Sequence, residues 1–267
     1  MDEVRVEHGA GGVTHVVLNR PDRFNALEAE SVEQLHRAFD AIARTPEIRV
    51  VVLRGEGKHF CAGADLAGHG VAPRGDGSHS PQDWMAVQQH ISTLVPRLRT
   101  LPQPVIAAVH GAASGGGFAL ALASDIRICA QDARFNAAFV RVGLSGCDIG
   151  VSWLLPRLVG ASRAFELLLT GRFLDAHEAQ RIGLVLDVVA SDELLARAGE
   201  VAEAIVANSP HGVRMTKKVM WAQLETGSLQ AGLALEDATQ VGAALSADHR
   251  EAVSAFVEHR PPRFTDR

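Results

Sequence analysis

The sequence predicts a mixed α/β fold with parallel strands, and two observations support this prediction. Short runs rich in Val, Ile and Leu alternate with longer stretches in which apolar residues recur at helical spacing. This alternation is typical of strands that are joined by helical crossovers, and such strands run parallel. A chain of 267 residues with 47% hydrophobic residues is also long and apolar enough to bury a sizeable core.

The predicted elements alternate along most of the chain. Strands are expected at residues 14–18, 50–53, 105–109, 126–129 and 185–189, and helices at residues 29–43, 80–99, 118–124 and 161–169. Residues 192–260 contain few strand-like runs and are predicted to be mostly helical. This change divides the chain into a core at residues 1–191 and a helical C-terminal region at residues 192–267.

Residues 68–81 differ from their surroundings because they are rich in Gly and Pro and poor in apolar side chains. This composition predicts an irregular loop. Two interpretations stay open, namely a lid over a neighbouring site and a tolerated surface insertion.

The composition argues against several classes of protein. The formal net charge of −5 gives no basic footprint for nucleic acid. The apolar runs are too short to span a membrane, and the first residues lack the basic-then-apolar order of a signal peptide. The cysteines Cys61, Cys129 and Cys147 show no metal-binding spacing, and scattered thiols fit a reducing compartment. We therefore expect a cytoplasmic protein without a metal.

The most informative stretch is the glycine-rich turn at residues 111–119. It follows the strand predicted at residues 105–109 and opens a predicted helix, so the consecutive glycines at residues 115–117 lie at a strand-to-helix turn. Backbone N–H groups at the start of a helix can hold a developing negative charge. A second turn of this kind lies at residues 60–65, and one donor from each turn would form an oxyanion hole. The alternative is that the glycines serve only close packing of helix against strand.

Several further segments occur in a characteristic order. They lie at residues 18–21, 25–27, 51–55, 60–66, 104–111, 115–117, 154–160, 169–172 and 182–185. Together they resemble the crotonase family, also called the enoyl-CoA hydratase/isomerase family, from about Val13 to Phe264. The resemblance implies a spiral of β-β-α turns whose C-terminal helices pack between the subunits of a homotrimer, or of a hexamer built from trimers. It also implies an acyl-CoA substrate, so coenzyme A enters as part of the substrate and no cofactor is permanently bound.

The resemblance also implies roles for individual residues. By position, the backbone N–H groups of Ala64 and Gly116 match the family's two donors to the thioester oxygen. The residues expected to contact coenzyme A are Arg23, Ala26, Leu27, Ala62, Asp65, Leu66 and Arg260. A short carboxylate in a turn usually caps backbone N–H groups, so Asp65 also has a structural interpretation. Asp125 resembles a buried structural cap of the family.

Two departures from the family pattern bear on the reaction. Members that hydrate enoyl-CoA carry two glutamates, and the matching positions here hold Ala119 and Phe139. Hydration needs a water that is placed and deprotonated while C2 of the acyl chain gains a proton, and paired carboxylates do this work. The resemblance therefore predicts very low hydratase activity for this chain.

A replacement carboxylate is present at Asp148, eight residues before Pro156. Counted back from this proline, the double-bond isomerases, dienoyl-CoA isomerases and aryl-CoA dehalogenases of the family place a catalytic carboxylate at the same position. Counted forward from Gly143, Asp148 lies one residue later than usual, which indicates a one-residue insertion. The alternative is a loop carboxylate that caps backbone N–H groups.

A single carboxylate suits a 1,3-proton shift, because it can move a proton from one carbon to another without using water. The apolar side chains expected to keep water away from Asp148 are those of Ala119, Phe139, Leu144 and Trp153. We therefore predict an enoyl-CoA double-bond isomerase of fatty-acid or related acyl-CoA metabolism. The alternatives are a hydratase, as the family name says, another enolate reaction such as acyl-CoA hydrolysis or dehalogenation, and a catalytically silent acyl-CoA-binding homologue.

Other candidate nucleophiles and bases have weaker support. Cys147 lies beside Asp148, but a free cysteine is usually a buried apolar residue. His59 and His110 lie near the two turns, and His110, at the end of a strand, is expected to bond to the backbone. Ser114 has no suitably placed His and Asp for a hydrolase triad.

Overall fold

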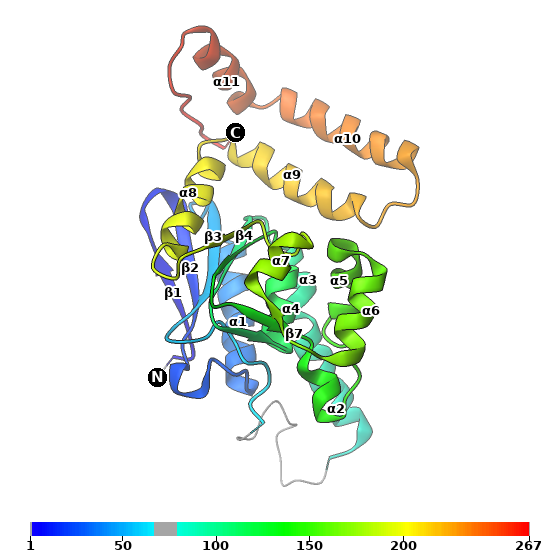
Figure 1. Ribbon diagram of the computed structural model, residues 1–267. Coiled ribbons are helices and arrows are strands. Elements are labelled where there is room, and N and C mark those ends of the chain that lie inside the picture. The colour runs from blue at the N-terminus through cyan, green and yellow to red at the C-terminus, as the bar shows by residue number, and fades with distance from the viewer. Residues whose placement is uncertain (1, 67–78, 267) are drawn as a thin grey trace.

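The computed structural model describes residues 2–66 and 79–266 (Figure 1). The strands are β1 (Val4–His8), β2 (Val13–Leu18), β3 (Val50–Gly55), β4 (Val105–Val109), β5 (Ala112–Ser114), β6 (Ile126–Ala130), β7 (Arg134–Asn136), β8 (Leu174–Asp175) and β9 (Asp187–Val189). The α-helices are α1 (Ala29–Ala43), α2 (Pro81–Ser92), α3 (Leu94–Thr100), α4 (Gly116–Ala123), α5 (Val151–Val159), α6 (Ala161–Thr170), α7 (Ala176–Arg181), α8 (Leu194–Val206), α9 (Pro210–Gln223), α10 (Leu229–Ala244) and α11 (Ala247–Val257). Short 3₁₀ helices lie at Ala10–Gly12, Pro21–Arg23 and Ala138–Val142.

A six-stranded sheet in the order β1-β2-β3-β4-β6-β9 forms the centre of the fold. β1 is antiparallel to β2, and every other pair of neighbours is parallel. A second sheet has the order β5-β7-β8, and the isolated bridge between Cys61 and Ala113 lies beside it. A long strand is thus followed by a short strand or bridge and then by a helix. This repetition confirms the predicted α/β class with its spiral of β-β-α turns.

Both faces of the large sheet are buried, which explains the apolar run at Val50–Leu53 of β3. Val51 and Leu53 lie in one apolar cluster with α1, whereas Val50 and Val52 lie in a second cluster with α8. Successive side chains of a strand point to opposite faces, so a strand that is covered on both sides is apolar throughout.

The predicted long helix at residues 80–99 consists of two helices, α2 and α3, which meet at Thr93. Pro96 explains the break, because it has no N–H to donate to the carbonyl of Ser92. The last predicted strand is shorter than expected and begins at Asp187. Four strands, β1, β5, β7 and β8, were not predicted, and three of these have only two or three residues, too few to show alternation.

The C-terminal region is helical, as predicted, and its helices pack in two ways. α8 covers the second face of the sheet, while α9 packs on the core through Lys217 and Trp221. α10 lies along α9, and α10 and α11 extend beyond α9 on the side away from α2 (Figure 1). The domain boundary at residue 191 stays a prediction. None of the described helices is long and apolar enough to cross a membrane. Most of the loop predicted at residues 68–81 lies outside the described residues.

Candidate active site

The glycine-rich turn joins β5 to α4 in a way that requires glycine. Gly115 has φ 51° and ψ −115°, a conformation that other residues rarely adopt. A Cβ on Gly117 would overlap the carbonyl oxygen of Cys61. The glycines therefore do serve close packing, which was one interpretation of the sequence. They also start α4 at Gly116, whose N–H has no partner within the helix.

The turn at residues 60–65 lies directly against the glycine-rich turn. Cys61 N–H donates to the carbonyl of Ala112 at 2.9 Å, and Ser114 N–H donates to the carbonyl of Cys61 at 2.9 Å. A Cβ on Gly63 would lie 3.5 Å from the nitrogen of Gly116. The segment that carries Ala64 is therefore held beside the start of α4.

Ala64 is held from its other side by Leu27. Leu27 N–H donates to the carbonyl of Gly63 at 2.7 Å, and Asp65 N–H donates to the carbonyl of Leu27 at 2.9 Å. In this parallel bridge the N–H of Ala64 itself faces away from Leu27. Within residues 2–66 and 79–266, the N–H groups of Ala64 and Gly116 have no hydrogen-bond partner. That both bind one oxygen atom stays a prediction.

Asp148 lies in the segment between the 3₁₀ helix and α5. Its Oδ1 accepts hydrogen bonds from Nε2 of Gln88 at 2.6 Å and from the N–H of Ile149 at 2.8 Å. Cδ1 of Ile149 lies 3.7 Å from the position that a Cβ on Gly116 would take. The neighbour of Asp148 in the sequence thus reaches the glycine-rich turn, so the structure brings the predicted carboxylate and one predicted donor to the same region. The carboxylate also caps a backbone N–H, as the structural alternative expected.

The four apolar side chains expected around Asp148 divide into two pairs. Ala119 is fully buried, and Cε1 of Phe139 lies 3.5 Å from the Cβ position of Gly115, so this pair lines the glycine-rich turn. Leu144, by contrast, is 59% exposed.

Trp153 lies between two arginines, with Arg157 3.6 Å and Arg99 4.6 Å from its ring centroid. Leu144 thus forms no buried wall in this chain, whereas Trp153 is partly buried against the core, and its expected role beside Asp148 stays a prediction. The guanidinium groups stack on the indole and hold it beside α3.

The residues expected to contact coenzyme A near the N-terminus partly come together. The segment around Ala26 and Leu27 joins the second turn, since Ala62 N–H donates to the carbonyl of Phe24 at 3.0 Å. Arg23 and Leu66 are exposed, and Leu66 shows 74% of its surface. Exposed side chains on adjoining segments suit an extended ligand.

The side chains of Asp65 and Arg260 have protein partners instead. Asp65 is 5% exposed and forms an ion pair with Arg20 at 3.1 Å, which favours its structural interpretation. Arg260 pairs with Glu251 and Glu258 at 2.6 Å each, so two carboxylates already occupy its guanidinium group. These pairings are those of a single chain, and the resemblance implies that Arg260 approaches coenzyme A of a neighbouring subunit, so its role stays a prediction.

The two histidines near the turns have backbone partners. His110 Nε2 lies 2.9 Å from the carbonyl oxygen of Gly57, which confirms the expectation for His110. Ala112 N–H donates to Nδ1 of His59 at 3.1 Å. Burial lowers the pKa of His59, and the nearby His110 adds to this effect. Among the described residues, no cluster of His, Cys, Asp and Glu could hold a metal ion.

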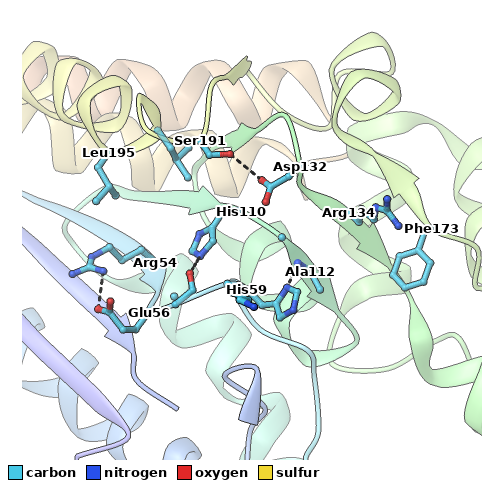
Figure 2. A pocket seen from close by; sticks show the side chains of 15 residues that line it. Arg54, Glu56, His59, His110, Ala112, Asp132, Arg134, Phe173, Ser191 and Leu195 are labelled. Atoms are coloured by element: carbon cyan, nitrogen blue, oxygen red, sulfur yellow. Dashed lines mark hydrogen bonds and ion pairs between the residues drawn. The ribbon is translucent and has the colours of Figure 1, made fainter. Parts of the chain in front are cut away.

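A cavity of about 810 Å³ lies at the ends of β3 and β4, and both histidines line it. Figure 2 shows His59 and His110 inside it, with the ion-paired Arg54 and Glu56 on one side. Neither predicted N–H donor nor Asp148 is among its lining residues. Sequence reasoning did not predict this cavity, because its walls come from segments that are far apart in the chain.

The fold and the two adjoining turns define a crotonase-type protein, and comparison with known proteins agrees. The family model described as enoyl-CoA hydratase/isomerase matches residues 8–267, so the chain belongs to the enoyl-CoA hydratase/isomerase family. It is 40% identical over 264 residues to a probable enoyl-CoA hydratase of Mycobacterium tuberculosis, covering 98% of this chain and 93% of the relative. It is also 40% identical over 265 residues to the 1,2-epoxyphenylacetyl-CoA isomerase of Escherichia coli, covering 99% of both chains.

Solved structures give the same result. A probable enoyl-CoA hydratase/isomerase from Mycobacterium abscessus matches with a TM-score of 0.91 at 37% identity, covering 100% of both chains. A monofunctional enoyl-CoA isomerase from Mycobacterium smegmatis matches with a TM-score of 0.74 at 39% identity, covering 87% of this chain and 99% of the other. Relatives named hydratase and isomerase thus resemble this chain to similar degrees, and membership of the family does not choose between the reactions.

Proposed function

We propose that this protein is an enoyl-CoA double-bond isomerase. The observation that carries the proposal is Asp148, a carboxylate in the segment that reaches the glycine-rich turn, while the nearby Ala119 and Phe139 carry no acid or base. A lone carboxylate can move a proton but has no second group to activate water. The isomerase name of the Escherichia coli relative, at 40% identity, is consistent with this reaction class.

In the proposed reaction, a 3-enoyl-CoA binds with its thioester oxygen on the N–H groups of Ala64 and Gly116. Asp148 removes a proton from C2, and the electron pair of the broken C–H bond delocalises into a dienolate. The two N–H groups stabilise the negative charge that develops on the thioester oxygen. Asp148 then returns the proton to C4, the double bond moves to C2–C3, and the thioester carbonyl forms again. Water is neither consumed nor released.

Hydration is the second candidate, because most of the similar proteins carry a hydratase name. The residues of this chain disfavour it. Loss of a positioned acid or base costs about 10²–10⁴-fold in rate. Ala119 and Phe139 supply neither group, so we expect hydration of 2-enoyl-CoA to be slower by at least that factor than in hydratases that carry both carboxylates.

A panel of CoA thioesters tests the proposal. The purified protein is given a 3-enoyl-CoA, crotonyl-CoA, a saturated acyl-CoA and a 4-halobenzoyl-CoA, and the products are followed by absorbance and mass. Conversion of the 3-enoyl-CoA without a change of mass supports the isomerase. Efficient gain of water by crotonyl-CoA would instead establish a hydratase, and release of free CoA or halide would establish a hydrolase or dehalogenase. Binding without turnover on every thioester would leave a silent acyl-CoA binder.

We further propose that the protein acts in the cytoplasm as a homotrimer, or as a hexamer built from two trimers. The C-terminal helices α10 and α11 leave large apolar side chains exposed, including Leu229 at 80%, Val241 at 63% and Phe256 at 82%. Such a surface is more apolar than a free chain normally shows to water. Light scattering at micromolar concentration tests this, and a monomer would contradict it.

A further inference from the structure

We propose that Gln88 is a positioning residue, which holds the carboxylate of Asp148 in one orientation. Gln88 lies on α2, sixty positions before Asp148 in the sequence, and donates from Nε2 to Oδ1 at 2.6 Å. The inference rests on the proposed isomerase function. It adds a residue that contacts neither the thioester nor the reacting carbons and acts through Asp148.

The two oxygens of Asp148 are in different environments. Oδ1 accepts the amide of Gln88 and the backbone N–H of Ile149, at 2.6 and 2.8 Å. Oδ2 has no hydrogen-bond partner among residues 2–66 and 79–266. Two donors on one oxygen prevent the carboxylate from turning about its Cβ–Cγ bond. Oδ2 is therefore the oxygen that is left for the substrate proton.

Gln88 is itself fixed by the way α2 is anchored. The helix begins with a capping box between Ser80 and Asp83, with Pro81 in its first turn. Val87, directly before Gln88, packs against the core, and Ile91, one turn later, is buried. The helix thus contacts the core through Val87 and Ile91, and Gln88 reaches Asp148 from the turn between them.

The second donor belongs to a residue with an unusual backbone conformation. Ile149 has φ 44°, in the left-handed region that β-branched residues avoid. Such outliers gather at functional sites because the surrounding structure holds them in place. Here the N–H of Ile149, in the peptide plane that it shares with Asp148, donates to Oδ1, while the side chain of Ile149 reaches Gly116.

The orientation of the Asp148 carboxylate matters more for the 1,3-proton shift than for the binding of the substrate. The same oxygen has to reach C2 and then C4 of the acyl chain, and it has to return the proton before water exchanges it. Without the hydrogen bond from Gln88, the Asp148 carboxylate would turn more freely. Oδ2 would then reach both carbons less often and would contact water more often. Loss of the Gln88 contact should therefore lower kcat and raise exchange with solvent, while leaving KM nearly unchanged.

The test compares Gln88→Leu with Gln89→Leu in the full-length protein, using a 3-enoyl-CoA in H₂O and in D₂O. Gln89 is the matched control, because it is exposed on the same turn of α2 and its side chain makes no hydrogen bond within the described residues. Ser92→Ala is a second control. It removes the other side-chain contact of Gln88 Nε2, which lies 3.4 Å from the hydroxyl of Ser92, and leaves the contact with Asp148 in place. Gln88→Ala serves if the leucine variant does not fold, because it also removes the amide and adds no charge beside Asp148.

We expect Gln88→Leu to lower kcat by about 10- to 100-fold with little change in KM, and to increase the deuterium content of the product formed in D₂O. Both controls should behave like the unmodified protein. An unchanged kcat and deuterium content in Gln88→Leu, while Asp148→Asn is inactive, would overturn the role of Gln88 and leave the isomerase proposal intact. A parallel loss of kcat, affinity and thermal stability would overturn it in favour of a purely structural role. Full turnover by Asp148→Asn would overturn the proposed function itself, and the role of Gln88 with it.

Discussion

Lys217 of α9 forms an ion pair with Asp125, in which Nζ lies 2.8 Å from Oδ2. The ammonium group also donates to the carbonyls of Leu98 and Gln103, at 3.0 and 2.9 Å, so each of its three hydrogens has an acceptor. Asp125 in turn accepts the indole N–H of Trp221 at 2.6 Å. The pair therefore joins the C-terminal region to the core, and it confirms the structural role expected for Asp125.

Replacing Lys217 tests the strength of this connection. Lys217→Met would leave the Asp125 carboxylate without its counter-ion and the carbonyls of Leu98 and Gln103 without the ammonium donor. Removing one member of a buried pair costs about 3–5 kcal/mol in the free energy of unfolding. Denaturant unfolding at fixed protein concentration measures the change. Lys218→Met, at an exposed neighbouring position, should change the free energy by no more than about 0.5 kcal/mol. Equal stability of the two variants would contradict the account.

Gly117 offers a test of the packing between the two turns. A Cβ at this position would overlap the carbonyl oxygen and the side chain of Cys61, so Gly117→Ala should push α4 away from the turn that carries Ala64. We expect a lower melting temperature and a large loss of isomerisation. Gly199→Ala is the matched control, because Gly199 lies in α8 with open space around its Cβ position. Alanine there should leave stability unchanged or raise it by about 0.5–1 kcal/mol. A stable and active Gly117→Ala protein would refute the packing argument.

The three cysteines should react very differently with a thiol reagent. Burial raises the pKa of Cys61 and of Cys129 to about 12, so only about one part in ten thousand of either thiol is ionised at pH 8. Cys147 is exposed, contrary to the expectation of a buried residue. Titration of the native protein with an aromatic disulfide should therefore release one equivalent quickly, and none from Cys147→Ser. Fast reaction of two or three thiols would contradict the burial. Normal turnover by Cys147→Ser would also exclude Cys147 as the nucleophile.

Much of the fold could be predicted from local patterns. The apolar run at Val50–Leu53 predicted a strand, and the structure has β3 there, extended by two residues to Gly55. The short strands β5 and β7 could not be predicted, because each is defined by its partner and not by its own three residues. The break between α2 and α3 was not predicted either, because the helical spacing of apolar residues continues past Pro96.

The candidate site was predictable only where a residue's type and its position in the sequence both matched a known pattern. The adjoining glycine-rich turns and Asp148 followed from sequence motifs, and the structure places them in one region. The contact between Gln88 and Asp148 joins positions sixty residues apart, and no local pattern marks Gln88 among the glutamines of α2. The contacts of Trp153 with Arg99 of α3 and Arg157 of α5 could not be predicted from the sequence either. Contacts between distant segments thus account for most of what sequence reasoning missed.

The central claim is that Asp148 carries the proton, and turnover of a 3-enoyl-CoA by Asp148→Asn tests it most directly. Asparagine keeps the size of the side chain and an oxygen that can accept from Gln88 and from the N–H of Ile149, but it cannot remove a proton. The account predicts that turnover at saturating substrate falls by about 10²–10⁴-fold, while acyl-CoA affinity and the melting temperature change little. A folded Asp148→Asn protein that isomerises the substrate at the original rate would show that Asp148 is a loop cap, and would contradict the account.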